Sequence, residues 1–273
     1  MKFFVDSAEL EHIQAARSYG ILDGVTTNPS LIKKAVLARQ KAGEEVDLAA
    51  YIRELLSIAQ DVPVSLEVGG GTSQEMIDQG RTLYSLFNAV AGNVWIKIPV
   101  DPSLPGDTDR HFEGIRAIRA LAREGIPINC TLIFTPEQAL LAANAGATAV
   151  SPFAGRVDDW LRTQNGLEFS KDDYFPALGL DQVQVRENQG LVSGVDLVRQ
   201  CVDILRAGGF STQVLAASLR NPRQVREAAL AGAHIATLPF SVVTSMRGHE
   251  QSVQGMQSFT ADLVPEYTAL FGE

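Results

Sequence analysis

The sequence is poor in the residue types that build disulfide frameworks and metal sites. It has 2 cysteines and 4 histidines in 273 residues. Cys130 and Cys201 are far apart and lie in apolar stretches, which indicates reduced thiols in a cytoplasmic protein rather than a disulfide or a cysteine-rich zinc site. The histidines show no metal-ligand spacing and none ends an expected strand, so no metal ion is expected.

Basic residues are also scarce. The chain has 23 lysines and arginines against 32 aspartates and glutamates, which gives a net charge of -9. Nucleic acids and anionic membranes are bound by basic surfaces, so neither is an expected partner. An anionic small substrate would require the few basic residues to gather at one site.

Long apolar segments are missing as well. No stretch approaches the ~20 apolar residues of a membrane-spanning helix. The apolar residues 3–5 are too few for the core of a secretion signal. With 45% hydrophobic and 20% charged residues, the chain can still bury a large core. No linker-like tract divides it, and its length suits one α/β barrel of ~250 residues, so residues 1–273 are expected to form one domain.

The sequence does contain a repeated alternation of short apolar runs and helical patterns. The runs that predict buried strands are residues 3–6, 24–27, 64–68, 94–100, 128–134, 149–153, 213–218 and 235–239. Most precede a helix with a recognisable start, such as Thr135-Pro136, Ser193 or Asn221-Pro222. This alternation is typical of parallel strands that are buried on both faces. We therefore predict a single (β/α)8 TIM barrel, with an open, doubly wound sheet as the alternative.

Two segments depart from the alternation. Residues 155–190 form a long, largely polar connection before the next clear helix. Such connections often act as lids, as residues 166–190 could here, and the alternative is a surface excursion with its own short helix. Residues 250–273 carry Phe259, Leu263 and Tyr267 at helical spacing. We expect them to form a C-terminal helical extension that packs on the barrel or on a neighbouring subunit.

Polar residues near the strand ends are the candidates for a site, because barrels of this kind place their active sites at the C-terminal ends of the strands. They are Asp6, Thr26, Thr27, Asn28, Glu67, Lys97, Asn129, Thr131, Ser151 and Ser218. A single strand-end Asp or Thr is more often structural, since it can cap the next helix. Lys97 is different because it lies in an apolar strand, where a lysine is rarely buried without a partner or a chemical role.

Lys97, Asp6 and Glu67 together suit amine chemistry. A neutral lysine can attack a ketone to form a Schiff base, and the iminium then allows an adjacent carbon–carbon bond to break. Two carboxylates could divide the proton transfers of this cleavage from those of the water and carbinolamine steps. Burial favours the neutral amine whereas nearby carboxylates favour the ammonium, and the sequence leaves that balance open.

Two arginines follow the expected sixth and seventh strands. Arg156 and Arg220 lie close in sequence to strand ends, and Ser218 precedes the second of them. Barrels often bind phosphate near their last loops. Two guanidinium groups and a hydroxyl suit a phosphate monoester, and the alternative is that both arginines form surface ion pairs.

Five stretches resemble the motifs of the transaldolase family and occur in the family's order. They are DGVTTNPSL (23–31), IKIP (96–99), NCTLIF (129–134), SPFAGR (151–156) and AASLRN (216–221). The resemblance runs from residue 1 to about residue 245. The chain length lies between those of the small and the large members of that family.

This resemblance implies a class I aldolase-type barrel that moves a dihydroxyacetone unit between sugar phosphates of the pentose phosphate pathway, with no cofactor. It assigns the Schiff base to Lys97 and the acid and base role in the carbon–carbon step to Asp6. Glu67 is expected to act through a water that Thr131 also holds. The residues that it implies for substrate binding are Thr27, Asn28, Asn129, Ser151, Phe153, Arg156, Ser218 and Arg220. Among these, the two asparagines and Ser151 are expected at the dihydroxyacetone hydroxyls, and Arg156, Ser218 and Arg220 at phosphate.

Two other functions stay open. The related fructose-6-phosphate aldolases release free dihydroxyacetone; they tend to carry Gln at the position of Glu67 and Tyr at that of Phe153, and they lack a match to Asn129. The sequence resembles transaldolases at all three positions. A non-catalytic sugar-phosphate-binding barrel is the second alternative, but it would have no use for Lys97 beside two carboxylates. The family resemblance also implies a homo-oligomer.

Overall fold

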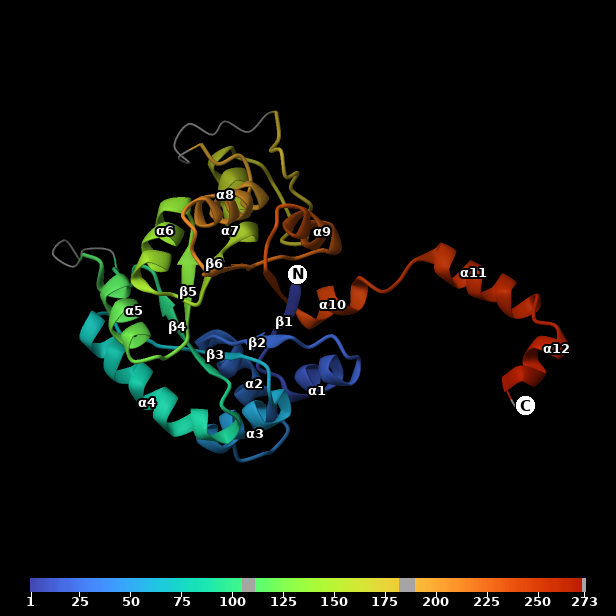
Figure 1. Cartoon of the computed structure of the whole chain (residues 1–273), viewed down its shortest axis with the longest axis horizontal. Helices are drawn as coiled ribbons and strands as arrows, with labels where there is room; N and C mark the ends of the chain where they lie inside the picture. The colour runs from blue at the N-terminus through green and yellow to red at the C-terminus, as the bar shows by residue number, and fades with distance from the viewer. Residues whose placement is uncertain (105–110, 182–189, 272–273) are drawn as a thin grey trace.

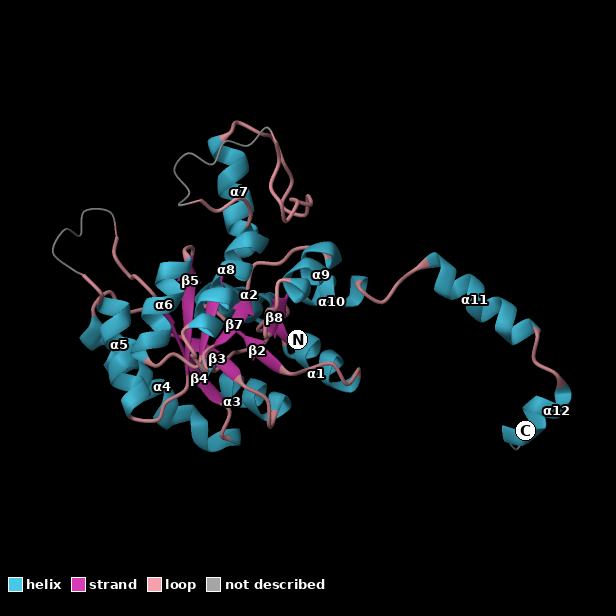
Figure 2. Cartoon of the chain, turned by 45° about the horizontal axis from the view of Figure 1, so that its top comes forward, coloured by secondary structure: helices cyan, strands magenta, loops and turns pink. Residues whose placement is uncertain are grey.

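A closed barrel of parallel strands forms the centre of the molecule. The computed structural model describes residues 1–104, 111–181 and 190–271. The strands pair in the order β1-β2-β3-β4-β5-β6-β7-β8, and β8 pairs with β1 to close the ring (Figures 1 and 2). Closure is seen where Phe4 pairs with Thr237. The TIM barrel is therefore confirmed, and the open sheet is excluded.

Each strand lies within two residues of its predicted range at either end. The strands are β1 (Lys2–Asp6), β2 (Gly24–Thr26), β3 (Val64–Glu67), β4 (Val94–Pro99), β5 (Ile128–Ile133), β6 (Ala149–Pro152), β7 (Gln213–Ala216) and β8 (Ile235–Leu238). Residues such as Val25, Ile96 and Val214 are fully buried. Burial on both faces explains why the strands read as almost continuous apolar runs.

Helices surround the barrel. They are α1 (Leu10–Ser18), α2 (Pro29–Lys41), α3 (Leu48–Ala59), α4 (Ser73–Ala91), α5 (Glu113–Arg123), α6 (Pro136–Ala145), α7 (Ala154–Gln164), α8 (Gly194–Ala207), α9 (Pro222–Leu230) and α10 (Phe240–Ser245). The caps predicted at Thr135, Ser193 and Asn221 are confirmed: the side chain of each accepts a hydrogen bond from a backbone N–H of the following first turn.

Of the two alternatives for residues 155–190, a lid or a surface excursion with its own short helix, the helix is present in the first part. α7 occupies residues 154–164, and its Val157 and Leu161 are buried one turn apart. The charged residues between these two positions obscured the helical pattern. Residues 182–189 of the suggested lid lie outside the described residues, so closure over a substrate stays a prediction.

Of the two expected packings of the C-terminal extension, packing on the barrel does not occur, and packing on a neighbouring subunit stays a prediction. The extension consists of α11 (Glu250–Ala261), α12 (Pro265–Thr268) and a 3-10 turn (Ala269–Phe271), and it projects away from the barrel (Figure 1). None of its described side chains is buried. It is not one helix, because Pro265 begins a new one after a break. Within the described ranges, no helix combines the length and apolar character needed to cross a bilayer.

Candidate active site

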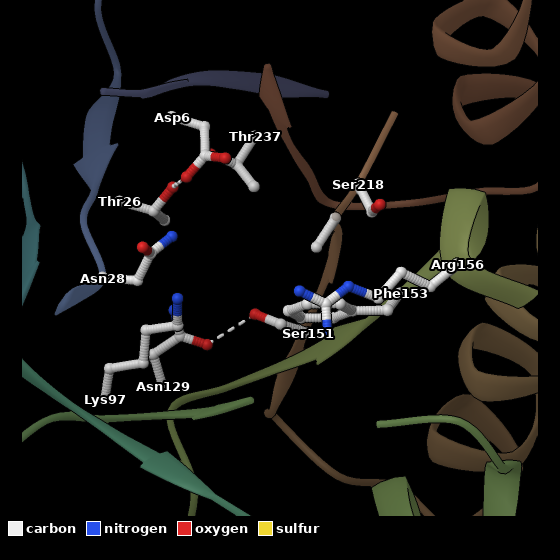
Figure 3. Close-up of a pocket in the computed structure, with 11 residues that line it drawn as sticks. Asp6, Thr26, Asn28, Lys97, Asn129, Ser151, Phe153, Arg156, Ser218 and Thr237 are labelled. Atoms are coloured by element: carbon white, nitrogen blue, oxygen red, sulfur yellow. Dashed lines mark hydrogen bonds between the residues drawn. The ribbon is translucent and has the colours of Figure 1, made fainter. Parts of the chain in front are cut away.

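A cavity of about 120 Å³ opens at the C-terminal ends of the strands. Its lining residues are Asp6, Thr26, Asn28, Lys97, Asn129, Ser151, Phe153, Arg156, Ala217, Ser218 and Thr237 (Figure 3). Nine of the thirteen candidates named from the sequence line it. The other four, Thr27, Glu67, Thr131 and Arg220, do not.

Lys97 is held by two acceptors at the base of the cavity. Its Nζ lies 3.1 Å from Oε2 of Glu67 and donates a hydrogen bond of 3.1 Å to the backbone carbonyl of Thr27. Only 6% of the lysine is exposed. Glu67 is its direct register partner on β3. The hydroxyl of Thr27 donates to the carbonyl of Ser65 instead, so this threonine positions Lys97 through its backbone.

Asp6 lies at the end of a chain of hydroxyl groups that the sequence did not reveal. Thr26 Oγ1 donates a 2.7 Å hydrogen bond to Asp6 Oδ1 and lies 2.5 Å from Thr237 Oγ1. Because Thr26 has one hydroxyl proton, Thr237 must be the donor in the second contact. Burial raises the pKa of Asp6, while the Thr26 hydrogen bond and the positive charge of Lys97 oppose this shift. The sequence did not point to Thr237, which is a single threonine within the apolar run 235–239.

A second chain of hydrogen bonds orients the polar groups on β5 and β6. The Ser151 hydroxyl donates to Asn129 Oδ1 at 2.6 Å, and Asn129 Nδ2 donates to Ser65 Oγ at 3.1 Å. All three residues are buried. These bonds fix the rotamer of Asn129 and the direction of its amide, a condition for selective binding of sugar hydroxyls.

Asn28 and Thr131 each keep a polar group that forms no hydrogen bond with the described residues. Asn28 Oδ1 accepts a 2.9 Å hydrogen bond from Leu31 N and caps α2, which leaves its Nδ2 as a donor for the cavity. Thr131 is buried, and its Oγ1 has no hydrogen-bond partner among the described residues. The strand is irregular after it, since Leu132 adopts a φ of 58°.

Phe153, Arg156 and Ser218 lie at one side of the cavity. The guanidinium carbon of Arg156 is 5.1 Å from the centre of the Phe153 ring, which gives this side a cation stacked on an aromatic face (Figure 3). Ser218 has a φ of 62° in the left-handed region, a conformation that is costly for a serine and is common at functional sites. A hydroxyl and a guanidinium can thus face an anion together.

Arg220 lies behind Ser218, outside the cavity lining. Its Nη1 and Nη2 donate to Oδ1 and Oδ2 of Asp159 at 2.6 and 2.5 Å. Both of its Nη atoms are therefore engaged in an ion pair, and of the two arginines only Arg156 lines the cavity. In the described part of the chain, no group of three or more potential ligands could hold a metal ion.

The chain is similar to a known family over nearly its whole length. Residues 3–269 match the family model described as transaldolase/fructose-6-phosphate aldolase. A "Probable transaldolase" of Exiguobacterium sibiricum is 40% identical over 262 residues, which are 96% of this chain and 97% of that protein. Proteins with the same name are 39% identical over 275 residues in Agathobacter rectalis, with both chains fully covered, and 41% identical over 262 residues in Prosthecochloris aestuarii, with 96% and 97% covered.

These matches correct the expectation about the end of the resemblance. The match continues to residue 269, so it includes α11 and α12 and does not stop near residue 245. This chain covers 97% or more of each of these three relatives.

Proposed function

Because the chain belongs to the transaldolase/fructose-6-phosphate aldolase family and is an enzyme of that family, we propose that it transfers a dihydroxyacetone unit between sugar phosphates through a Schiff base on Lys97. The donor is sedoheptulose 7-phosphate or fructose 6-phosphate, and the acceptor is glyceraldehyde 3-phosphate or erythrose 4-phosphate, all sugars of the pentose phosphate pathway. The observation that supports this most is a buried lysine amine, 3.1 Å from a carboxylate, in a cavity that also contains Asp6.

In the proposed first half-reaction, Glu67 accepts a proton from the Lys97 ammonium, and the free amine attacks the ketone carbon of the donor. The carbinolamine then loses water, with Glu67 transferring the proton through a water that Thr131 binds. The hydroxyl of buried Thr131, which has no hydrogen-bond partner among the described residues, supports this role. The result is an iminium that can accept the electrons of the bond to be broken.

Asp6 acts next. Its carboxylate takes the proton of the C4 hydroxyl, the C3–C4 bond breaks, and the aldose phosphate leaves while its three-carbon partner remains on Lys97 as an enamine. The enamine attacks the aldehyde of the acceptor and Asp6 returns the proton. Hydrolysis then frees the new ketose phosphate and Lys97. The hydrogen bond from Thr26 orients the Asp6 carboxylate for both transfers.

The remaining polar groups would bind the substrate. We propose that Asn28 and Asn129, helped by Ser151, bind the dihydroxyacetone hydroxyls. The hydrogen bonds that fix Asn129 support this, because a held amide presents one defined donor and acceptor pattern. Arg156 and Ser218 would bind the phosphate from the opposite side of the cavity.

We propose transfer rather than release of free dihydroxyacetone. The chain has Glu67, Asn129 and Phe153 at the positions where the two activities of the family differ. The Phe153 ring lines the cavity without a polar group of its own. A phenyl ring there offers no hydroxyl to bind water, so the enamine is left to react with an aldehyde acceptor.

Borohydride trapping tests the Schiff base directly. Fructose 6-phosphate is incubated with the protein, the iminium is reduced, and the adduct is mapped by mass spectrometry. A label on Lys97 is expected, and it should be absent from a Lys97→Met variant. A label elsewhere, or none, would refute the mechanism. The same mixture with and without erythrose 4-phosphate separates the two activities, because a transferase should form little free dihydroxyacetone without an acceptor.

We also propose that the enzyme is a cytoplasmic homo-oligomer whose C-terminal extension packs on a second copy. The extension has apolar side chains that no described part of its own chain covers: Val253, Met256, Phe259, Leu263, Val264, Tyr267, Leu270 and Phe271. An apolar stripe of this size on a projecting helix pair is typical of an interface. Two buried free thiols, Cys130 and Cys201, suit a reducing compartment.

A further inference from the structure

The ion pair between Asp159 and Arg220 is unusually well shielded for the rim of a barrel. Asp159 lies on α7, and Arg220 follows β7. Their side chains are 23% and 14% exposed, and both carboxylate oxygens take part in the contact. A bidentate, largely shielded pair of this kind fixes the plane of the guanidinium group, which a single surface contact would not do.

The geometry of this pair leaves one edge of the guanidinium unused. Asp159 occupies the end formed by Nη1 and Nη2. The other N–H of Nη1 donates to the carbonyl of Lys171 at 3.1 Å. The side edge, formed by Nε and the second N–H of Nη2, has no hydrogen-bond partner among the described residues. Two parallel N–H groups on such an edge match two oxygens of a phosphate.

The Nε atom of this edge lies beside the start of α7 and the Ser218 hydroxyl. A Cβ atom placed on Gly155 would lie 3.0 Å from Arg220 Nε and 3.2 Å from Ser218 Oγ. The same atom would lie 2.1 Å from the Ser218 carbonyl oxygen, so only glycine permits this approach. The first turn of α7, Ser218 and the free edge of Arg220 therefore converge on one point beside the cavity. Arg156 begins on the same turn.

The backbone of Arg220 is held from the same helix. Arg220 N donates to Gln224 Oε1 at 2.8 Å, and Gln224 Nε2 donates to Asp158 Oδ2 at 2.9 Å. Asp158 and Gln224 are 1% and 2% exposed. Two successive acids of α7 thus act on Arg220: Asp159 binds its side chain directly, and Asp158 orients Gln224 of α9, which binds its backbone N–H.

We infer that Asp159 is a positioning residue for substrate phosphate: it holds Arg220 so that the Nε edge, with Ser218 and Arg156, receives the phosphate group. This inference rests on the proposed function for its substrate, since it assumes a phosphorylated sugar. Without Asp159, the arginine would have to be ordered by the phosphate itself, and a loss of rotamer freedom would oppose binding.

The test uses a substitution for which simple electrostatics and the positioning role predict opposite changes in phosphate affinity. Asp159→Asn removes a negative charge near an anion site, so simple electrostatics predicts tighter phosphate binding. The positioning role predicts the opposite: the Kd of inorganic phosphate, measured by calorimetry, and the KM of fructose 6-phosphate should both rise ~10-fold. The kcat/KM for fructose, which lacks the phosphate, should stay within ~2-fold, because Asp159 touches neither Lys97 nor Asp6. Tighter or unchanged phosphate binding would overturn the inference.

Two further variants exclude a purely structural effect. Asp159→Glu keeps the carboxylate and should restore most of the affinity, even where the Asn variant is poorly folded. In an Arg220→Gln background, Asp159→Asn should have no further effect on phosphate, since the group it positions is gone. An equal loss of phosphate affinity in that background would refute the positioning role.

Glu124→Gln is the matched control, because Glu124 forms a comparable two-point pair with Arg81 at 2.6 and 3.1 Å at the end of α5. It should leave phosphate affinity unchanged, and a loss equal to that of Asp159→Asn would also overturn the inference. Calorimetry with inorganic phosphate needs no turnover. Failure of borohydride trapping would therefore refute the proposed function without deciding the role of Asp159.

Discussion

Lys97 and Glu67 are register partners on adjacent parallel strands, and their side chains meet at 3.1 Å. Partners in a parallel pair project to the same side, so the contact follows from the backbone pairing of β3 and β4. The amine therefore has a proton acceptor beside it before any substrate enters. The contact with Glu67 also shows what stabilises the nearly buried ammonium group of Lys97 in an otherwise apolar strand.

Replacing Glu67 with glutamine tests this contact. Glu67→Gln removes the proton acceptor but keeps a polar side chain of the same size. We expect kcat to fall by ~10²–10⁴-fold, the usual contribution of a positioned acid or base, with a smaller change in KM. Borohydride should still label Lys97, but more slowly. Glu9→Gln, which affects an exposed pair with Lys34, serves as the control. Unchanged kcat and trapping rates would contradict the role of Glu67.

Asp6→Asn should inactivate the enzyme and yet stabilise it at neutral pH. Burial raises the pKa of Asp6 in the folded state above its ordinary value of 3.8. Stability is therefore lost as the pH rises from that value through the raised pKa, because the unfolded chain releases the proton first. Asparagine removes this cost, and ~1 kcal/mol would raise Tm by ~2–4 °C in a chain of this size. Thermal unfolding between pH 4 and 8 measures the difference, which should grow with pH; a difference that shrinks would contradict this account.

Thr237→Val should reduce activity through an effect on Asp6, although Thr237 does not itself contact the Asp6 carboxylate. The valine cannot donate to Thr26, so the hydrogen bond from Thr26 to Asp6 is less strongly polarised. We expect kcat/KM to fall ~3–10-fold, and its acidic limb to move to higher pH because a hydrogen bond that lowers the pKa of Asp6 is weakened. Thr237→Ser keeps the donor and should behave like the original enzyme. A pH profile that valine leaves in place would rule out this chain of hydroxyl groups.

Phe153→Tyr should shift the reaction from transfer toward release. The ring lines the cavity, and a phenol hydroxyl on it could hydrogen-bond a water that protonates the enamine in place of the acceptor. Free dihydroxyacetone formed per molecule of transferred product is the quantity to measure, at fixed donor and acceptor concentrations. Phe134→Tyr, at the ring that contacts Phe153 at 5.8 Å between centroids, tests whether any added hydroxyl nearby is enough. An unchanged product ratio in Phe153→Tyr would count against its role.

Charges on α11 should dissociate the proposed oligomer. Met256 and Phe259 are 63% and 71% exposed, and burial against a second copy would exclude water from both. Met256→Asp or Phe259→Asp should lower the mass measured by light scattering to that of the monomer. Ser258→Asp adds the same charge to the same helix at a polar position and should leave the mass unchanged. A monomeric starting protein, or an oligomer that survives both substitutions, would disprove the interface.

The strands and most of the cavity could be predicted from the sequence because both depend on local patterns. Apolar runs of strand length defined β1 to β8 within two residues, and the polar residues at their ends had to meet once the strands ran in parallel. Asp6, Lys97, Asn129 and Ser151 line one cavity for this reason. The helix starts were equally local, since a cap needs only its own first turn.

The tertiary structure alone decided the partners of these residues. Thr237 reaches Thr26 only because β8 closes onto β1. Arg220 turns to Asp159 because α7 and the end of β7 lie side by side, which no spacing in the sequence records. The secondary structure of a segment and the alternation of its side chains depend on residues that are neighbours in the sequence. Strand register, barrel closure and helix packing instead join residues far apart in the chain. Sequence therefore determined which groups reach the mouth of the barrel, and packing determined which groups they hold.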